Sequence, residues 1–234
     1  WYHFRNYGYV LREMSFSDVE LSYVSQNISL LSSHLLVDPK RMALRNATDT
    51  TEGDLLLIVN GDNSTGYRAA STGFTGGIAA FMLNKQQNVV APSFLKTDGD
   101  FVDVAVDLDT IYVVVKSTIG GYAKYYVEVF DDDMTTDIGV QSNAAFGMTN
   151  YAGHSHLEVK TVAVIRDDIV DPSVTVAGGI VSVASTASSY VEAGLDYDVI
   201  VETMPIELQL PTGNVVSKQK RVVEANPVLY RSQN

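Results

Sequence analysis

A run of acidic residues is the first place where the sequence could do chemistry. Asp131, Asp132 and Asp133 are consecutive, and Asp137 follows closely. Clustered carboxylates are the ligands that a hard cation such as Ca²⁺ prefers. The run lacks the glycine and the terminal glutamate of an EF-hand loop, so we favour a solvated acidic turn after a strand over a cation site.

A second acidic set could supply the carboxylate pair of a glycoside hydrolase. Its members are Asp98, Asp100, Asp103, Asp107 and Asp109. In this stretch valines alternate with acidic residues, which is the period of a strand with one wet face. Acidic residues on such a face favour solubility and protect a sheet edge. Catalysis at these residues is therefore the disfavoured interpretation.

Two histidines stand close together in His154-Ser155-His156. On a strand the two imidazoles would share a face, but a catalytic zinc site requires a third protein ligand. The sequence identifies no such third residue. Histidines in a loop are the favoured interpretation.

No nucleophile or phosphate-binding motif accompanies these residues. The chain has no G-x-S-x-G, no Walker A loop, no G-x-G-x-x-G and no cysteine. The one concentrated basic group is Lys218, Lys220 and Arg221, which suits an interface or the protection of a sheet edge. We therefore expect no enzyme activity, no catalytic, cofactor-binding or metal residues, and no cofactor.

Composition narrows the class of protein further. The 234 residues carry 16 Lys and Arg against 28 Asp and Glu, a net charge of -12 that argues against a surface gripping nucleic-acid phosphates. No apolar run approaches the roughly 18–20 residues of a membrane span, so no membrane insertion is expected. The chain starts at Trp1, which suggests a fragment of a longer polypeptide.

The pattern along the chain predicts mainly β structure with one short N-terminal helix. Helical spacing occurs at residues 15–36, where Ser17 could act as N-cap and Pro39 would end the helix. The apolar residues at that spacing are Ile28, Leu31 and Leu35. From 98 to 130, three strands separated by short turns predict a β-meander, the unit of a propeller blade or a small sandwich sheet.

A polar stretch rich in Gly, Asn and Ser at 131–156 suggests a domain boundary. We expect a meander or propeller-like domain with the N-terminal helix at residues 1–150, and a β-sandwich or barrel-like domain at 151–234.

The stretch VETMPIELQLP at 201–211 interrupts a strand pattern with Pro205. Because proline donates no ladder hydrogen bond, the stretch suits an edge strand or a bend. Glu202 and Glu207 would not share a face of an unbroken strand, so they do not form an acid pair.

Several phrases in order resemble one protein family. They include TDGDFVDVAV at 97–106, DTIYVVVK at 109–116, HLEVKTV at 156–162 and ETMPIE at 202–207. The other phrases lie at 15–19, 33–36, 87–91, 126–131 and 192–197. Together they resemble the tail nozzle proteins of short-tailed bacteriophages, also called tail tubular protein B or DNA-stabilisation proteins. One departure is Val159, where such proteins commonly have glycine.

The resemblance implies a structural virion protein without enzyme activity. Such proteins form rings, usually hexamers, that line the channel for genome retention and DNA ejection into the host. Their partners are adaptor and tail-fibre proteins, and genomic DNA passes without sequence-specific binding. An acidic wall would let that polyanion slide by repulsion.

Two other functions stay open from the residues. An extracellular β-module for adhesion or carbohydrate binding would suit the absence of cysteine and the Ser/Thr/Asn-rich turns. A β-propeller or β-sandwich hydrolase is disfavoured because no catalytic constellation is visible. A ring of several copies would favour the nozzle, and a monomer with affinity for glycans would favour adhesion.

Overall fold

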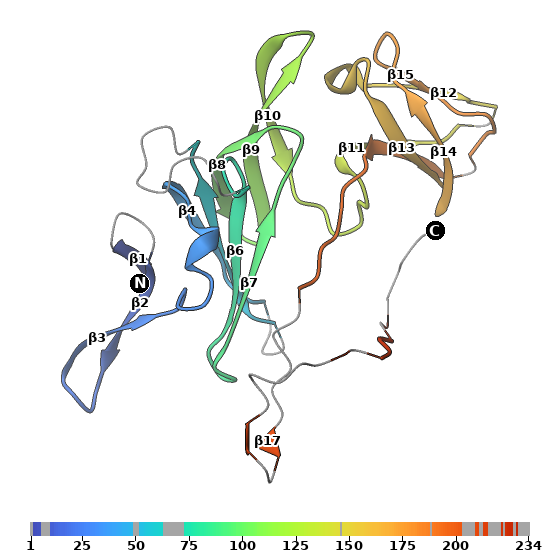
Figure 1. The fold of residues 1–234 in the computed structure, drawn as a ribbon. Helices are drawn as coiled ribbons and strands as arrows, with labels where there is room; N and C mark the ends of the chain where they lie inside the picture. Colours follow the sequence, from blue (N-terminus) through green and yellow to red (C-terminus); the bar gives the residue numbers. More distant parts are fainter. Residues whose placement is uncertain are drawn as a thin grey trace.

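Antiparallel β-sheets dominate the protein, as the sequence predicts (Figure 1). A computed structural model describes residues 2–5, 10–48, 52–62, 73–145, 147–187, 189–202, 209–210, 213–214, 221, 223–226 and 228. No helix in those ranges is long and apolar enough to cross a membrane. The mainly β fold class is confirmed.

The first sheet has the order β1-β2-β3, and its strands are β1 (Tyr2–Arg5), β2 (Val10–Ser17) and β3 (Ser22–Asn27). Figure 1 shows the hairpin of β2 and β3 pointing away from the neighbouring sheet. Phe16 lies opposite Tyr23 in the register, and the two rings meet edge to face with centroids 5.4 Å apart. Such aromatic cross-strand pairs stabilise a hairpin.

The predicted helix at 15–36 is wrong. The segment forms the β2–β3 hairpin and ends in a single 3₁₀ turn, η1 (Ser33–Leu35). Ile28 and Leu35 are buried as a helix face would require, but Leu31 is 77% exposed. Pairing between β2 and β3 satisfies the backbone of this segment and overrides the helical spacing, which is a weak local signal.

The second sheet lies at the centre of the packing, with the order β4-β5-β6-β7. Its strands are β4 (Pro39–Arg45), β5 (Asp54–Asn60), β6 (Ile78–Asn84) and β7 (Val89–Leu95). Strands β5 and β6 are buried on both faces, which explains their continuous apolar runs. One core cluster covers one face and contains Leu11, Ile28, Leu35, Leu36, Leu56, Ile58, Ala79, Phe81 and Leu83.

The third sheet is the meander predicted at 98–130, with the order β10-β9-β8. Its strands are β8 (Asp100–Asp107), β9 (Thr110–Ile119) and β10 (Tyr122–Val129). Its inner face packs on the other side of β5 and β6. That core cluster contains Leu57, Val59, Ile78, Ala80, Phe101, Val104, Ile111, Val113 and Val115. The meander prediction is confirmed.

Strands β11 to β16 form a separate core of their own. They are β11 (Asp137–Asn143), β12 (Asn150–Ala152), β13 (Thr161–Arg166), β14 (Ile169–Thr175), β15 (Ile180–Ser182) and β16 (Tyr190–Leu195), with the 3₁₀ turn η2 (Ser155–Leu157). Four of them form a sheet in the order β11-β16-β13-β14, and β12 pairs with β15. Tyr151, Leu157 and Val162 are among the buried side chains.

Two short strands, β17 (Gln209–Leu210) and β18 (Gly213–Asn214), pair with each other near the C-terminus. The domain limits 1–150 and 151–234 stay predictions. We call the sheets up to β10 the N-terminal unit, and the strands β11 to β16 the C-terminal unit.

Candidate functional site

The structure separates the two parts of the acidic run at 131–137. Asp131 and Asp133 lie in an exposed turn, where the Asp131 carboxylate accepts a hydrogen bond of 2.9 Å from the Asp133 N–H. Asp137 is the first residue of β11 and bonds elsewhere. Among the described residues, no three His, Asp or Glu side chains gather as a metal site would require.

The acidic residues of the β7–β9 region are also dispersed. Asp103 lies 3.5 Å from the Arg41 guanidinium, and Asp107 is exposed at the end of β8. Asp98 pairs with Lys160 of the C-terminal unit. A β-bulge beside Val102 shifts the predicted alternation, because Phe101 rather than Val102 faces the core.

The two histidines of 154–156 take different roles around η2. His154 is fully buried, and its Nδ1 lies 3.3 Å from the Tyr151 carbonyl. Burial lowers the pKa of His154, with a smaller contribution from the charge of His156. The Nε2 of His156 donates to the Ile138 carbonyl at 2.9 Å, which ties η2 to β11. Their contacts are those of core packing.

Part of the basic and proline-containing C-terminal sequence lies outside the described residues. Lys218, Lys220, Pro205 and Glu207 belong to that part. Arg221 and Glu202 are described and exposed. The predictions for these segments stay predictions.

Contacts between the N-terminal and C-terminal units centre on one carboxylate. Asp137 accepts a hydrogen bond of 2.9 Å from the Thr97 hydroxyl and one of 3.3 Å from the Asp98 N–H. The Lys160 ammonium lies 2.5 Å from the Asp98 carboxylate. These bonds link the β7–β8 connection to β11 and to the residue before β13. No pattern in the sequence signals this junction, because Thr97 and Asp137 lie 40 positions apart.

A second carboxylate, that of Glu128, lies at the same junction, and one of its oxygens lacks a hydrogen-bond donor. Glu128 sits on β10, and its Oε1 is buried with no hydrogen-bond partner. Burial, and then the nearby Asp137, raises the pKa of Glu128 to about 7. Burial also raises the pKa of Asp137, against the effect of its hydrogen bonds from Thr97 and Asp98. Glu128 is therefore an acceptor that the chain itself leaves unsatisfied.

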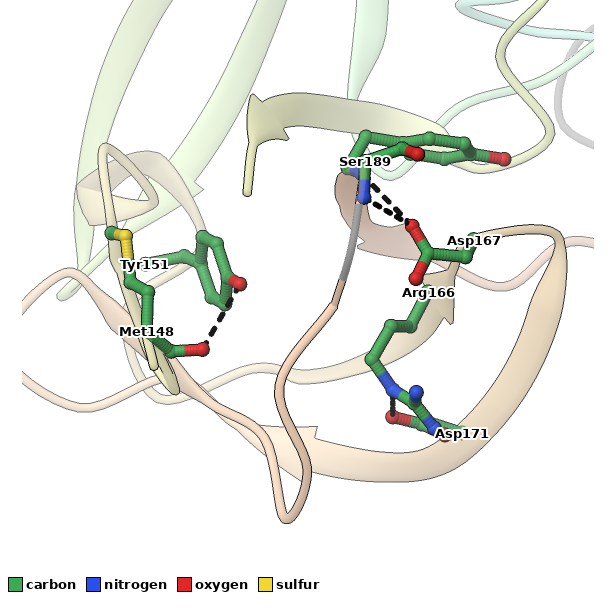
Figure 2. A network of polar contacts seen from close by, with 7 residues as sticks. Met148, Tyr151, Arg166, Asp167, Asp171 and Ser189 are labelled. Carbon is green, nitrogen blue, oxygen red and sulfur yellow. Dashed lines mark hydrogen bonds and ion pairs between the residues drawn. The ribbon is translucent and has the colours of Figure 1, made fainter. Parts of the chain in front are cut away.

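Another polar network fixes the hairpin between β13 and β14 (Figure 2). Arg166 donates two hydrogen bonds to Asp171, at 2.9 and 3.0 Å. Asp167 lies in the turn and accepts hydrogen bonds from the N–H groups of Ser189 and Tyr190, at 2.7 and 3.1 Å. Both carboxylates of this network have donors within the fold, so the network holds the sheet together and presents no free chemical group.

Exposed apolar side chains form two surfaces that the sequence alone does not reveal. The hairpin tip consists of Phe16, Val19, Leu21 and Tyr23, of which Val19 is 95% and Leu21 80% exposed. The β10 face consists of Tyr125, Val127 and Val129 on the outer side of the third sheet, with Val127 73% exposed. Large exposed apolar patches are typical of surfaces that bind other proteins.

The fold and these surfaces define a class: an antiparallel β protein whose described part exposes two apolar surfaces and leaves the Glu128 Oε1 buried without a partner. Comparison with known proteins adds no narrower assignment. No protein-family model matches the chain, and no curated protein matches it.

Proposed function

We propose that the chain is a ring-forming structural subunit of a phage tail nozzle, without enzyme activity, and that it is located in the virion. It would line the channel for genome retention and DNA ejection, beside adaptor and tail-fibre proteins. The exposed hairpin tip carries this proposal. A projecting arm with apolar residues at its end suits insertion against a neighbouring copy. A head-to-tail contact of this kind forms a ring when the rotation between successive copies closes.

The backbone at Val159 also supports the proposal. Val159 has φ 68°, a left-handed conformation that costs a β-branched residue free energy and costs glycine none. Tail nozzle proteins commonly have glycine at the matching position of the His-Leu-Glu phrase. The chain thus has the backbone that the family's glycine would need, although its side chain differs.

Replacing Val159 by glycine should therefore stabilise the protein. We expect Val159→Gly to raise the free energy of unfolding by about 1 kcal/mol, because the left-handed strain outweighs the added backbone entropy. Urea unfolding followed by circular dichroism measures the change. The matched control is Val199→Gly, since Val199 is similarly exposed and has no positive φ. Equal effects at both positions would contradict the strain.

The distribution of acidic residues supports passage of DNA. The net charge is -12, and β8 carries Asp100, Asp103 and Asp107. A channel wall of this charge repels a polyanion and lets it slide, whereas a basic wall would bind it with release of counterions. A positive potential along the channel of the assembled ring would overturn this part of the proposal.

Electron microscopy of the purified protein tests the ring directly. We expect rings of several copies, and we expect Leu21→Asp at the hairpin tip to abolish them without lowering the free energy of unfolding. Leu108→Asp is the control, because Leu108 is similarly exposed in the β8–β9 turn. A monomer that binds glycans would favour the adhesion module instead. In the phage particle, a location away from the tail axis would exclude the nozzle function.

A further inference from the structure

We infer that β10 is a pairing edge for a second copy of this chain, in which two β10 strands meet antiparallel about a two-fold axis at Tyr126. This contact is independent of the ring contact at the hairpin tip. A two-fold contact uses the same patch on both copies and closes after two, so it leaves the hairpin tip free.

The first observation is an open strand edge. β10 pairs only with β9 within the described residues, and it lies at one end of the sheet β10-β9-β8. The Phe130 N–H donates to the Ile111 carbonyl of β9 at 3.1 Å. Every second residue of β10, counted back from Phe130, therefore directs its backbone N–H and C=O groups toward β9. Because alternate residues point to opposite sides of a strand, the N–H and C=O groups of Tyr125 and Val127 point to the open edge. Those groups are available to another strand.

The second observation is charge complementarity within the strand. A two-fold axis at Tyr126 places Lys124 of each copy opposite Glu128 of the other, so the contact contains two such pairs. The Lys124 side chain is exposed, whereas Glu128 has a buried Oε1 without a partner. The Lys124 ammonium of the second copy would donate a hydrogen bond to that oxygen. Its positive charge would also offset the repulsion between Glu128 and Asp137, which together with burial raises the pKa of Glu128.

The same register is favourable for the other residues. Tyr125 lies opposite Val127 of the second copy, so their open N–H and C=O groups meet as a hydrogen-bonded pair. The two side chains project to the outer face, where they are 63% and 73% exposed in the single chain. Pairing an aromatic with a β-branched residue across strands is favourable and removes apolar surface from water.

Three other edge strands, β7, β14 and β8, do not offer this match. β7 contains Pro92 and β14 contains Pro172, and proline interrupts a ladder. β8 carries only acidic charges, so two copies of it would repel each other. β10 contains no proline and carries one basic residue, Lys124, and one acidic residue, Glu128.

Disulfide trapping tests the register, because the natural chain has no cysteine. In the proposed pair, the two copies of residue 126 form a pair without hydrogen bonds, with Cα atoms about 4.5 Å apart, which permits a disulfide. We expect Tyr126→Cys to form a cross-linked dimer on mild oxidation. Val127→Cys is the control, since its two copies would be offset along the strands beyond disulfide reach.

Charge exchange then tests the pairing itself, in the Tyr126→Cys background. Lys124→Glu or Glu128→Lys alone should reduce cross-linking at least tenfold, because each places like charges opposite each other twice. An equimolar mixture of the two variants should restore cross-linking, since opposite charges then face each other at both positions. Circular dichroism melting shows whether each variant folds.

Two outcomes would overturn the inference. One is equal cross-linking at positions 126 and 127, and the other is cross-linking that charge exchange does not change. If Glu128→Lys fails to fold, Lys124→Glu still decides, because Lys124 is an exposed side chain. The ring is read separately by microscopy, so failure of the nozzle proposal and failure of this pairing are distinguishable.

Discussion

Replacing Phe81 by alanine is expected to lower the free energy of unfolding by about 3–5 kcal/mol, because it leaves a large cavity in a fully buried site. Phe81 has no exposed surface and lies on β6, at the centre of the four-stranded sheet. Its core cluster joins this sheet to Leu11 of β2 and to Leu36. Loss of this packing should weaken both the sheet and the attachment of the N-terminal hairpin.

The neighbouring residue supplies a matched control. Met82 follows Phe81 on the same strand but is half exposed, so Met82→Ala should cost less than about 1 kcal/mol. Urea titration followed by circular dichroism measures both variants. Equal losses for the two variants would show that the central sheet does not depend on this core cluster.

The fold class follows from the sequence wherever burial is one-sided. The alternation of valine with acidic residues in 102–107 predicts a strand with one wet face, and β8 has that form apart from its bulge. The run at 55–59 belongs to a strand buried on both faces, where the alternation disappears. Periodicity alone does not distinguish such a run from a buried helix.

The N-terminal helix shows where local pattern fails. Ile28 and Leu35 are both buried in one core cluster, but the cluster is assembled from separate segments of chain. Their spacing therefore reflects tertiary packing. The intervening Leu31 is exposed, and only knowledge of the neighbouring sheets could have shown this.

The candidate surfaces depend on contacts between distant residues. The sequence groups Asp137 with Asp131–Asp133, whereas the fold bonds it to Thr97. Likewise, the sequence alone does not suggest that Lys124 of one copy could pair with Glu128 of another. That pairing is considered only because β10 lies at a sheet edge. Residue types show which groups can interact, and topology decides which of them meet.

Glu192 leads to the second large effect, which concerns the segment that joins the two units. Glu192 lies on β16 and is 2% exposed, and its Oε1 accepts hydrogen bonds from the Thr135 N–H at 2.9 Å and from the Thr136 hydroxyl at 2.8 Å. The Thr135 hydroxyl adds a third, at 3.3 Å. One buried acceptor thus fixes the residues between β10 and β11.

We expect Glu192→Ala to lower the free energy of unfolding by about 2–4 kcal/mol, since it removes charge-assisted hydrogen bonds and leaves their donors unsatisfied. Glu192→Gln keeps one acceptor oxygen and should lose less than half as much. Limited proteolysis should cut the alanine variant near Thr135 faster than the natural protein, because the released segment becomes accessible. The exposed Glu202→Ala is the control for loss of charge alone. If Glu192→Ala and Glu202→Ala had the same free energy of unfolding and the same resistance to proteolysis, the Glu192 carboxylate would not anchor this segment. The contacts of Asp137 with Thr97 and Asp98 would then have to hold the two units together.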